Sequence, residues 1–173
     1  ITYAMFIMVH SLFVLIYGWF VFKNRATGRV PDSLVSVIIP VYNQEKLIEK
    51  VVNAVFCSTY PNLEVVVVND GSKDNTGAVI DALAAKNPRL KVIHKPNGGK
   101  RTAVAAGFYA AKGHFVVLID SDSIVDKYAI EECMKVFSAN PKVGGVVGNG
   151  KVLNADKNLL TKCQDVWYDN AFN

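Results

Sequence analysis

The stretch VSVIIPVYN, residues 35–43, shows the pattern that predicts the fold: a short β-branched, apolar run that ends in polar residues. Five such runs occur, over residues 35–39, 63–68, 90–94, 115–119 and 143–147. Helical patterns lie between them over 45–57, 75–86, 100–112 and 127–139, and a last helix is expected from 157 to the end. Strands that alternate with helices of about 10–15 residues are typical of βαβ units. The sequence therefore predicts an α/β fold with a mostly parallel sheet covered by helices on both faces.

Polar residues follow four of the predicted strands, at 40–43, 69–72, 95–100 and 120–122. In an open parallel sheet, a ligand binds outside the carboxyl ends of the strands. We therefore expect these four segments to meet at one crevice.

The Asp120-Ser121-Asp122 segment follows the wholly apolar run FVVLI. Two carboxylates at a strand end can supply oxygen ligands to Mg²⁺ or Mn²⁺ and leave positions for phosphate oxygens. The alternative is a turn whose acids cap the helix that begins near Lys127. The position after a buried strand favours the metal.

Asp70 ends the second predicted strand, within NDGSKDN. A carboxylate there can accept an N–H from a nucleotide base. The alternative is an Asp-Gly turn, with Asp74 or Asn75 capping the next helix. The two readings are compatible, because Asp74 and Asn75 can cap the helix while Asp70 faces the crevice.

The segment Asn97-Gly-Gly-Lys-Arg101 precedes a predicted helix. Glycines let the backbone approach a ligand, a helix N-terminus attracts anions, and Lys100 and Arg101 add charge suited to a diphosphate. The alternative is a helix-start loop with a solvated basic pair. The acids at the other strand ends favour the ligand, because a cation and phosphates would lie between the two groups.

Residues 1–22 contain no Asp, Glu, Lys or Arg, so all 19 basic and 15 acidic residues lie in the rest of the chain. A helix of 22 residues is about 33 Å long, enough for the roughly 30 Å hydrocarbon core of a bilayer. No basic leader or small-x-small cleavage site marks a signal peptide. We expect residues 1–22 to be a transmembrane helix, with sequence missing before Ile1.

Residues 23–33 form a basic juxtamembrane linker, with Lys23, Arg25 and Arg29 before the first acid at Asp32. By the positive-inside rule, the domain that follows, residues 34–173, is expected in the cytoplasm, and the whole protein in the plasma membrane. Three widely spaced cysteines agree with a reducing compartment. The net charge of +4 comes partly from this linker, so no nucleic-acid partner is expected.

Other site classes fit the sequence less well. Gly145 to Lys151 matches G-x-x-x-x-G-K, but Val152 stands where a phosphate loop needs Ser or Thr. The first strand lacks the G-x-G-x-x-G of a dinucleotide-binding domain. No Ser-His-Asp or Cys-His set is apparent, and His94 and His114 are interpreted as structural.

Taken in order, VSVIIPVYN with Glu45, VVVNDGSKDNT, NGGKR and LIDSDS resemble the family 2 glycosyltransferases of the GT-A fold. The resemblance covers about residues 34–173. It implies that Pro40, Tyr42, Asn43 and Asp70 lie at the donor nucleotide, with the uridine contacted by the last three. It also implies that Lys100 and Arg101 approach the diphosphate, that Asp120 lies near the ribose or diphosphate, and that Asp122, with Asp120, holds Mg²⁺ or Mn²⁺.

The later stretch VLNADKNLLTKCQDVWYDNAFN is similar to processive membrane synthases of that family, and most to bacterial-type hyaluronan synthases. The resemblance implies an inverting enzyme with several membrane helices that takes UDP-N-acetylglucosamine and UDP-glucuronate and extends a polysaccharide. Asn69 departs from the Asp often found in hyaluronan synthases, which keeps chitin or poly-N-acetylglucosamine synthases open. The family's general base is expected beyond Asn173, so a UDP-binding fragment without activity is a further alternative.

Overall fold

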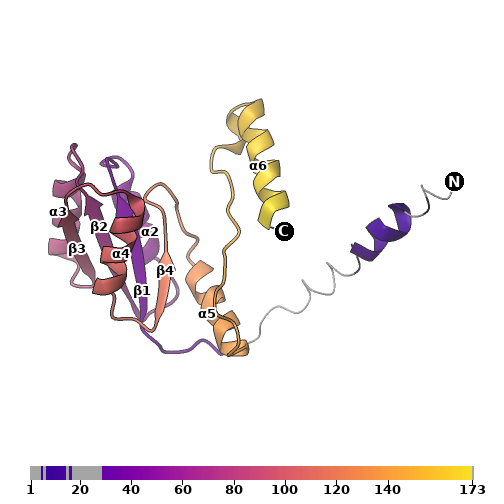
Figure 1. Cartoon of the computed structure of the whole chain (residues 1–173), viewed down its shortest axis with the longest axis horizontal. Helices are drawn as coiled ribbons and strands as arrows, with labels where there is room; N and C mark the ends of the chain where they lie inside the picture. The colour runs from indigo at the N-terminus through magenta and orange to yellow at the C-terminus, as the bar shows by residue number, and fades with distance from the viewer. Residues whose placement is uncertain (1–4, 6, 15, 17–28, 173) are drawn as a thin grey trace.

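The computed structural model of the chain describes residues 5, 7–14, 16 and 29–172. Figure 1 shows strands and helices that alternate along the chain, as the sequence predicts. The elements are β1 (Val35–Val41), α2 (Ile48–Phe56), β2 (Leu63–Asp70), α3 (Thr76–Lys86), β3 (Leu90–Lys95), α4 (Lys100–Ala110), β4 (Phe115–Leu118), α5 (Ala129–Ala139), the 3₁₀ turn η1 (Ala155–Lys157) and α6 (Leu159–Phe172).

The four strands form one parallel sheet in the order β3-β2-β1-β4. The chain moves outward from β1 through β2 to β3, and then returns to place β4 on the other side of β1. The order therefore reverses between β1 and β4, and such a switch point is where open α/β sheets bind their ligands.

Helices cover both faces of this sheet, as the sequence predicts. On one face, α2, α3 and α5 contribute Val51, Ile80 and Met134 to a core with the apolar side chains of β1 and β2. On the other face, α4 packs through Ala103 against Val66 and Val68. Both central strands are therefore apolar on both sides, and every residue of β1 is buried.

Close packing of α4 on the sheet depends on a glycine. A Cβ at Gly107 would lie 2.4 Å from the Cγ2 atom of Ile38 and 3.2 Å from that of Val68. No side chain fits there without displacing the helix. Since α4 begins at Lys100, this contact also sets where the Gly-Gly-Lys segment lies at the end of the sheet.

Two sequence predictions differ from the structure. Residues 143–147 were expected to form a fifth strand, but they have no regular secondary structure: Gly144 and Gly145 interrupt the run, and Val147 is 81% exposed with no strand beside it. Helix α2, expected over residues 45–57, begins at Ile48. Residues 44–47 form a turn instead, in which the N–H groups of Leu47 and Ile48 both donate to the Gln44 carbonyl.

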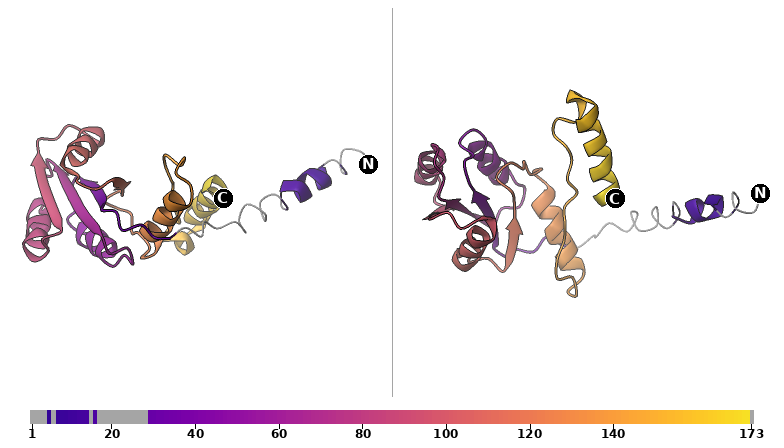
Figure 2. Two further views of the ribbon diagram at one scale, coloured as in Figure 1. Left: turned by 90° about the horizontal axis from the view of Figure 1, so that it is seen from below. Right: turned by 45° about the horizontal axis from the view of Figure 1, so that its top comes forward.

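The predicted membrane span lies largely outside the described residues, as does the linker up to residue 28. Residues 5, 7–14 and 16 are described and are helical. In the described part of the chain, no helix combines the length and the apolarity needed to cross a bilayer. Figures 1 and 2 show that this short helical segment and α6 both stand apart from the sheet.

Candidate functional site: a cleft at the strand ends

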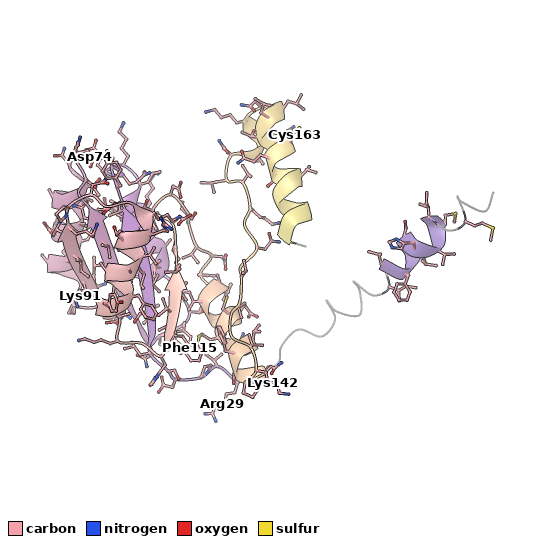
Figure 3. The ribbon with its side chains drawn as sticks, viewed as in Figure 1. Arg29, Asp74, Lys91, Phe115, Lys142 and Cys163 are labelled. Carbon is pink, nitrogen blue, oxygen red and sulfur yellow. The ribbon has the colours of Figure 1, made fainter. Side chains whose placement is uncertain are left out.

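A cleft of about 190 Å³ opens beyond the carboxyl ends of β1 and β4, at the switch point of the sheet. Figure 3 shows Asp74, which follows β2, at this end of the sheet, and Phe115, which begins β4, toward the opposite end. The cleft is lined by residues from the ends of three strands and from α4: Pro40, Val41, Tyr42, Asp70, Lys100, Ala103, Asp120, Ser121 and Asp122. The structure thus brings together residues that are up to 82 positions apart in the sequence.

The loops that follow β1 and β2 are joined by reciprocal hydrogen bonds. The Asn43 N–H donates to the Ser72 hydroxyl at 3.0 Å, and the Lys73 N–H donates back to Asn43 Oδ1 at 2.8 Å. The Glu45 N–H donates to Asp74 Oδ2 at 3.3 Å, and the Asn75 N–H donates to Glu45 Oε2 at 3.0 Å. We call these two joined loops the rim of the cleft. Their hydrogen bonds fix the rim beside Tyr42.

Asp74 also organises the start of α3. Its Oδ1 accepts the Thr76 N–H at 3.0 Å and the Thr76 hydroxyl at 2.5 Å, and the bond from that hydroxyl is the chief reason that its pKa lies below its ordinary value. Asn75, the other capping candidate, makes no side-chain cap hydrogen bond. The capping prediction therefore holds for Asp74.

Asp70 is the most strongly held acid of the cleft. Its side chain is 5% exposed, and Lys95 Nζ lies 2.5 Å from its Oδ1. Oδ1 also accepts the Gly98 N–H at 3.0 Å, and Oδ2 accepts the Gly99 N–H at 2.8 Å. The hydrogen bond from Lys95 holds the pKa of the Asp70 carboxyl below its ordinary value, with the two backbone N–H groups as further causes.

These contacts shape the glycine loop ahead of α4. Gly99 has φ 86°, in the left-handed region that glycine adopts most easily, and its carbonyl accepts the Thr102 and Ala103 N–H groups of the first turn. Asp70 therefore places the N-terminus of α4 at the cleft. The first N–H groups of a helix, together with its dipole, favour a bound anion.

Lys100, the first residue of α4, crosses the cleft to Asp120, with Nζ 2.5 Å from Oδ1. Both side chains are more than half exposed, so this ion pair contributes little to stability and can rearrange when a ligand binds. Asp122 is exposed and accepts a long 3.5 Å hydrogen bond from the Ser123 hydroxyl.

The chemistry of the acids at the end of β4 fits a cation shared with a ligand. Within the described residues, no three His, Cys, Asp or Glu side chains are grouped closely enough to form a protein-only metal centre. Mg²⁺ is commonly bound through one or two carboxylates, with water and substrate phosphates completing its shell. Asp120 and Asp122 supply that number of carboxylates beside the α4 N-terminus.

Six of the eight residues singled out in the sequence line the cleft: Pro40, Tyr42, Asp70, Lys100, Asp120 and Asp122. Asn43 is not among the lining residues and serves the rim through its hydrogen bonds. Arg101 is exposed on α4 and is also absent from the lining. Lys95 was missed as an individual residue, because its pairing with Asp70 depends on the β2–β3 register.

The sequence has relatives among characterised synthases. It is 39% identical over 138 residues to a hyaluronan synthase of Pasteurella multocida. This alignment covers 80% of this chain and 14% of the relative. It is 30% identical over 173 residues to a poly-β-1,6-N-acetyl-D-glucosamine synthase of Staphylococcus aureus, covering 96% of this chain and 42% of the relative. The chain thus spans less than half the length of these relatives.

Solved structures share its fold. A mannosyltransferase from Pyrobaculum calidifontis, in complex with GDP-mannose and Mn²⁺, matches with a TM-score of 0.63 and 29% identity over 75% of this chain and 41% of that one. TarS of S. aureus in complex with UDP-GlcNAc matches with a TM-score of 0.56 and 27% identity over 69% of this chain and 41% of the other.

The family model for glycosyl transferase family 2 matches residues 36–169, which include β2, β3, β4, all of β1 but its first residue, and the whole cleft. The fold is accordingly the α/β arrangement of GT-A enzymes, with a parallel four-stranded sheet. The chain belongs to glycosyl transferase family 2.

Proposed function

We propose that this chain is the donor-binding part of a membrane-bound, inverting glycosyltransferase that uses UDP-sugars to extend a polysaccharide. One observation carries the proposal: at the switch point of the sheet, a single cleft holds an anchored acid, a lysine on a helix N-terminus and two exposed acids. Those groups match, in order along the cleft, a base, a diphosphate and a divalent cation.

The nucleoside belongs at the β1–β2 side of the cleft. A carboxylate has about four acceptor positions, and Lys95, Gly98 and Gly99 occupy three of those on Asp70. One acceptor position on Oδ2 is left for the N–H of a uracil. Tyr42 is 42% exposed on the adjoining rim and offers an aromatic face.

The diphosphate belongs between α4 and the end of β4. Lys100 and the N–H groups that begin α4 offset its negative charge, and Arg101 adds to the field from just outside the cleft. Asp120 and Asp122 would hold Mg²⁺ or Mn²⁺ against the phosphate oxygens, and that ion would supply Lewis-acid stabilisation of the leaving UDP.

In the reaction, an acceptor hydroxyl forms a bond to the anomeric carbon of the sugar while the bond from that carbon to UDP breaks. The residues of this chain act on the leaving side, since Lys100 meets the charge that develops on the diphosphate. The proposal assigns this chain to the donor and places the base that takes the acceptor proton outside it.

We propose hyaluronan, made from UDP-N-acetylglucosamine and UDP-glucuronate, as the polymer. The identity to the P. multocida hyaluronan synthase favours it. A poly-N-acetylglucosamine or chitin synthase is the second candidate, favoured by the alignment with the S. aureus enzyme over 96% of the chain. A hyaluronan-specific lyase, applied to the polymer that the whole protein makes, separates the two candidates. Degradation of the polymer supports hyaluronan, and a resistant polymer contradicts it.

We place the enzyme in the plasma membrane, with several membrane helices in the whole protein and this domain at the cytoplasmic face. The uncharged residues 1–22 and the basic residues after them support this location. There the domain meets UDP-sugars and delivers the growing chain to the membrane.

Calorimetric titration tests the donor site directly. The chain is titrated with UDP in the presence and absence of Mn²⁺, with GDP as the matched control. We expect UDP to bind, with an affinity that Mn²⁺ raises, and GDP to bind more weakly. Absence of UDP binding at millimolar concentration would contradict the proposal, and binding without glycosyl transfer by the whole protein would favour a non-catalytic UDP-binding module.

A further inference from the structure

His94 lies outside the cleft but is connected to its rim by a chain of hydrogen bonds. Its Nε2 is 2.9 Å from Asp81 Oδ1 on α3, and its Nδ1 is 3.1 Å from Asn69 Nδ2 on β2. The strand register places Asn69 directly beside His94. No part of the sequence motif containing Asn69 indicates this contact, since 25 residues separate the two.

The hydrogen-bond pattern identifies the atoms of the Asn69 amide. Asn69 Oδ1 accepts the Ser72 N–H at 3.0 Å, and a backbone N–H can only donate. The NH₂ group of Asn69 therefore faces His94, whose Nδ1 must be an unprotonated acceptor. The imidazole proton then sits on Nε2, where the Asp81 carboxylate accepts it.

The chain continues from Ser72 to the cleft. The Ser72 hydroxyl accepts the N–H of Asn43, whose φ of 51° is the one positive value of a non-glycine residue in the described part of the chain. Residues with a Cβ adopt this region less readily than glycine, although Asn does so more often than most, and the hydrogen bonds around Asn43 hold it there. Asn43 follows Tyr42, which lines the cleft.

We propose that His94 is a positioning residue for the nucleoside end of the donor cleft. Its neutral Nδ1 fixes the Asn69 amide, Asn69 holds the 69–72 turn, and Ser72 holds Asn43 in its left-handed conformation. The inference rests on the proposed function, because it assigns a purpose to the rim only if a nucleotide binds there.

Protonation of His94 opposes this arrangement. An imidazolium donates from both nitrogens, so its Nδ1–H would meet the NH₂ of Asn69. Turning the amide over would place that NH₂ against the Ser72 N–H instead. Neither orientation satisfies both neighbours, so the arrangement requires the neutral imidazole.

The groups around the imidazole come from α3 and β2. Asp81 is the charged group on α3 that contacts it, and Asn69 is its polar neighbour on β2. The Asp70–Lys95 pair lies one position further along the same two strands. The charged residues of α4 lie on the other face of β3, where Ile93 packs with Ala103.

Two substitutions of His94 separate its two contacts. His94→Asn puts an amide oxygen at the position of Nδ1, where it can accept from Asn69, and loses Asp81. His94→Gln places its amide near Nε2, where it keeps Asp81 and loses Asn69. His114→Gln, at an exposed histidine that precedes β4, is the matched control.

We expect His94→Gln to weaken UDP binding about three- to tenfold, the effect of one lost hydrogen bond. His94→Asn and His114→Gln should stay within about twofold of the unmodified chain by the same measure.

Nitrogen NMR of the chain without nucleotide provides an independent readout. We expect the neutral Nε2–H tautomer of His94. The Nδ1–H tautomer would overturn the inference. UDP binding that is equally strong in His94→Gln and His94→Asn would overturn the positioning role alone, whereas an unmodified chain that binds no UDP would overturn the proposed function itself.

Discussion

The two sides of the cleft are built in different ways. At the ends of β1 and β2, the acids are hydrogen-bonded into the protein: Asp70 is buried and accepts from three donors, and Asp74 joins two loops. At the end of β4, Asp120 and Asp122 are exposed, and Asp120 makes one ion pair with an equally exposed lysine. The chain thus has a closed acid cluster around Asp70 and an open one around Asp122.

This difference shows what each side can do. A carboxylate held by three donors presents its one remaining acceptor position in a fixed direction, which suits recognition of a rigid base. Carboxylates with free oxygens can accept a cation and change partners as phosphates arrive. We expect substitutions on the closed side to lower stability first, and substitutions on the open side to lower ligand binding with little effect on stability.

Asp70→Ala should produce the largest change. Removal of this carboxylate leaves Lys95 and two loop N–H groups without their acceptor, and breaking a buried pair costs about 3–5 kcal/mol. Because the Lys95 side chain is still 21% exposed, we expect a loss at the lower end, about 3 kcal/mol in the free energy of unfolding measured with urea. Asp156→Ala, at an exposed acid in η1, is the control, and an equal loss in the two variants would contradict the comparison.

Gly71→Ala should be the next largest. Gly71 has φ 71°, and a Cβ there would lie 2.7 Å from the Asn97 backbone nitrogen. Strain and overlap together should lower the free energy of unfolding by about 2 kcal/mol. Gly144→Ala adds its Cβ where nothing lies within 4 Å, and its stability should change by less than about 0.5 kcal/mol. Equal thermal shifts for the two would show that the glycine loop is not tightly packed.

Lys100→Ala tests the open side. The ion pair that Lys100 makes is exposed, so the free energy of unfolding should change by less than about 0.5 kcal/mol. UDP affinity should fall about tenfold, since a charged donor to the diphosphate is lost, while uridine affinity stays the same. Lys142→Ala, remote from the cleft, is the matched control. A loss of uridine binding equal to that of UDP would place Lys100 at the base instead.

The pH dependence of stability should come from the closed side, and this effect should be smaller than those of the substitutions above. Because the folded chain lowers the pKa of Asp70 below its ordinary 3.8, the stabilisation is fully present above about pH 4 and is lost as the pH falls through the folded-state pKa. Urea midpoints between pH 7 and pH 3 should therefore fall less in Asp70→Asn than in the unmodified chain. Parallel curves would assign the acid sensitivity to other groups.

Much of the fold, and the position of the cleft, could be predicted from local sequence. The β-branched runs identify the four strands, and the polar residues after them locate the cleft, because parallel strands bring their carboxyl ends together. The run at 143–147 misled because apolar character predicts a strand only where a neighbour pairs with it, and two glycines leave it unpaired.

Contacts across strands could not be predicted. Lys95 meets Asp70 and His94 meets Asn69 through the β2–β3 register, which depends on how the whole core packs. His94 was interpreted as structural, and the local sequence does not indicate the hydrogen bonds that connect it to the rim of the cleft. The hydrogen bonds that fix an exposed rim follow from geometry and not from local residue patterns.

The most direct test of the account is the gain in UDP affinity that Mn²⁺ produces, measured by calorimetry in the unmodified chain and in Asp122→Ala. We expect Mn²⁺ to strengthen UDP binding in the unmodified chain. We expect Asp122→Ala to lose most of this gain, while its stability and its metal-free UDP affinity are unchanged. An Asp122→Ala chain that keeps the full Mn²⁺ effect would contradict the assignment of the open acid cluster to the cation.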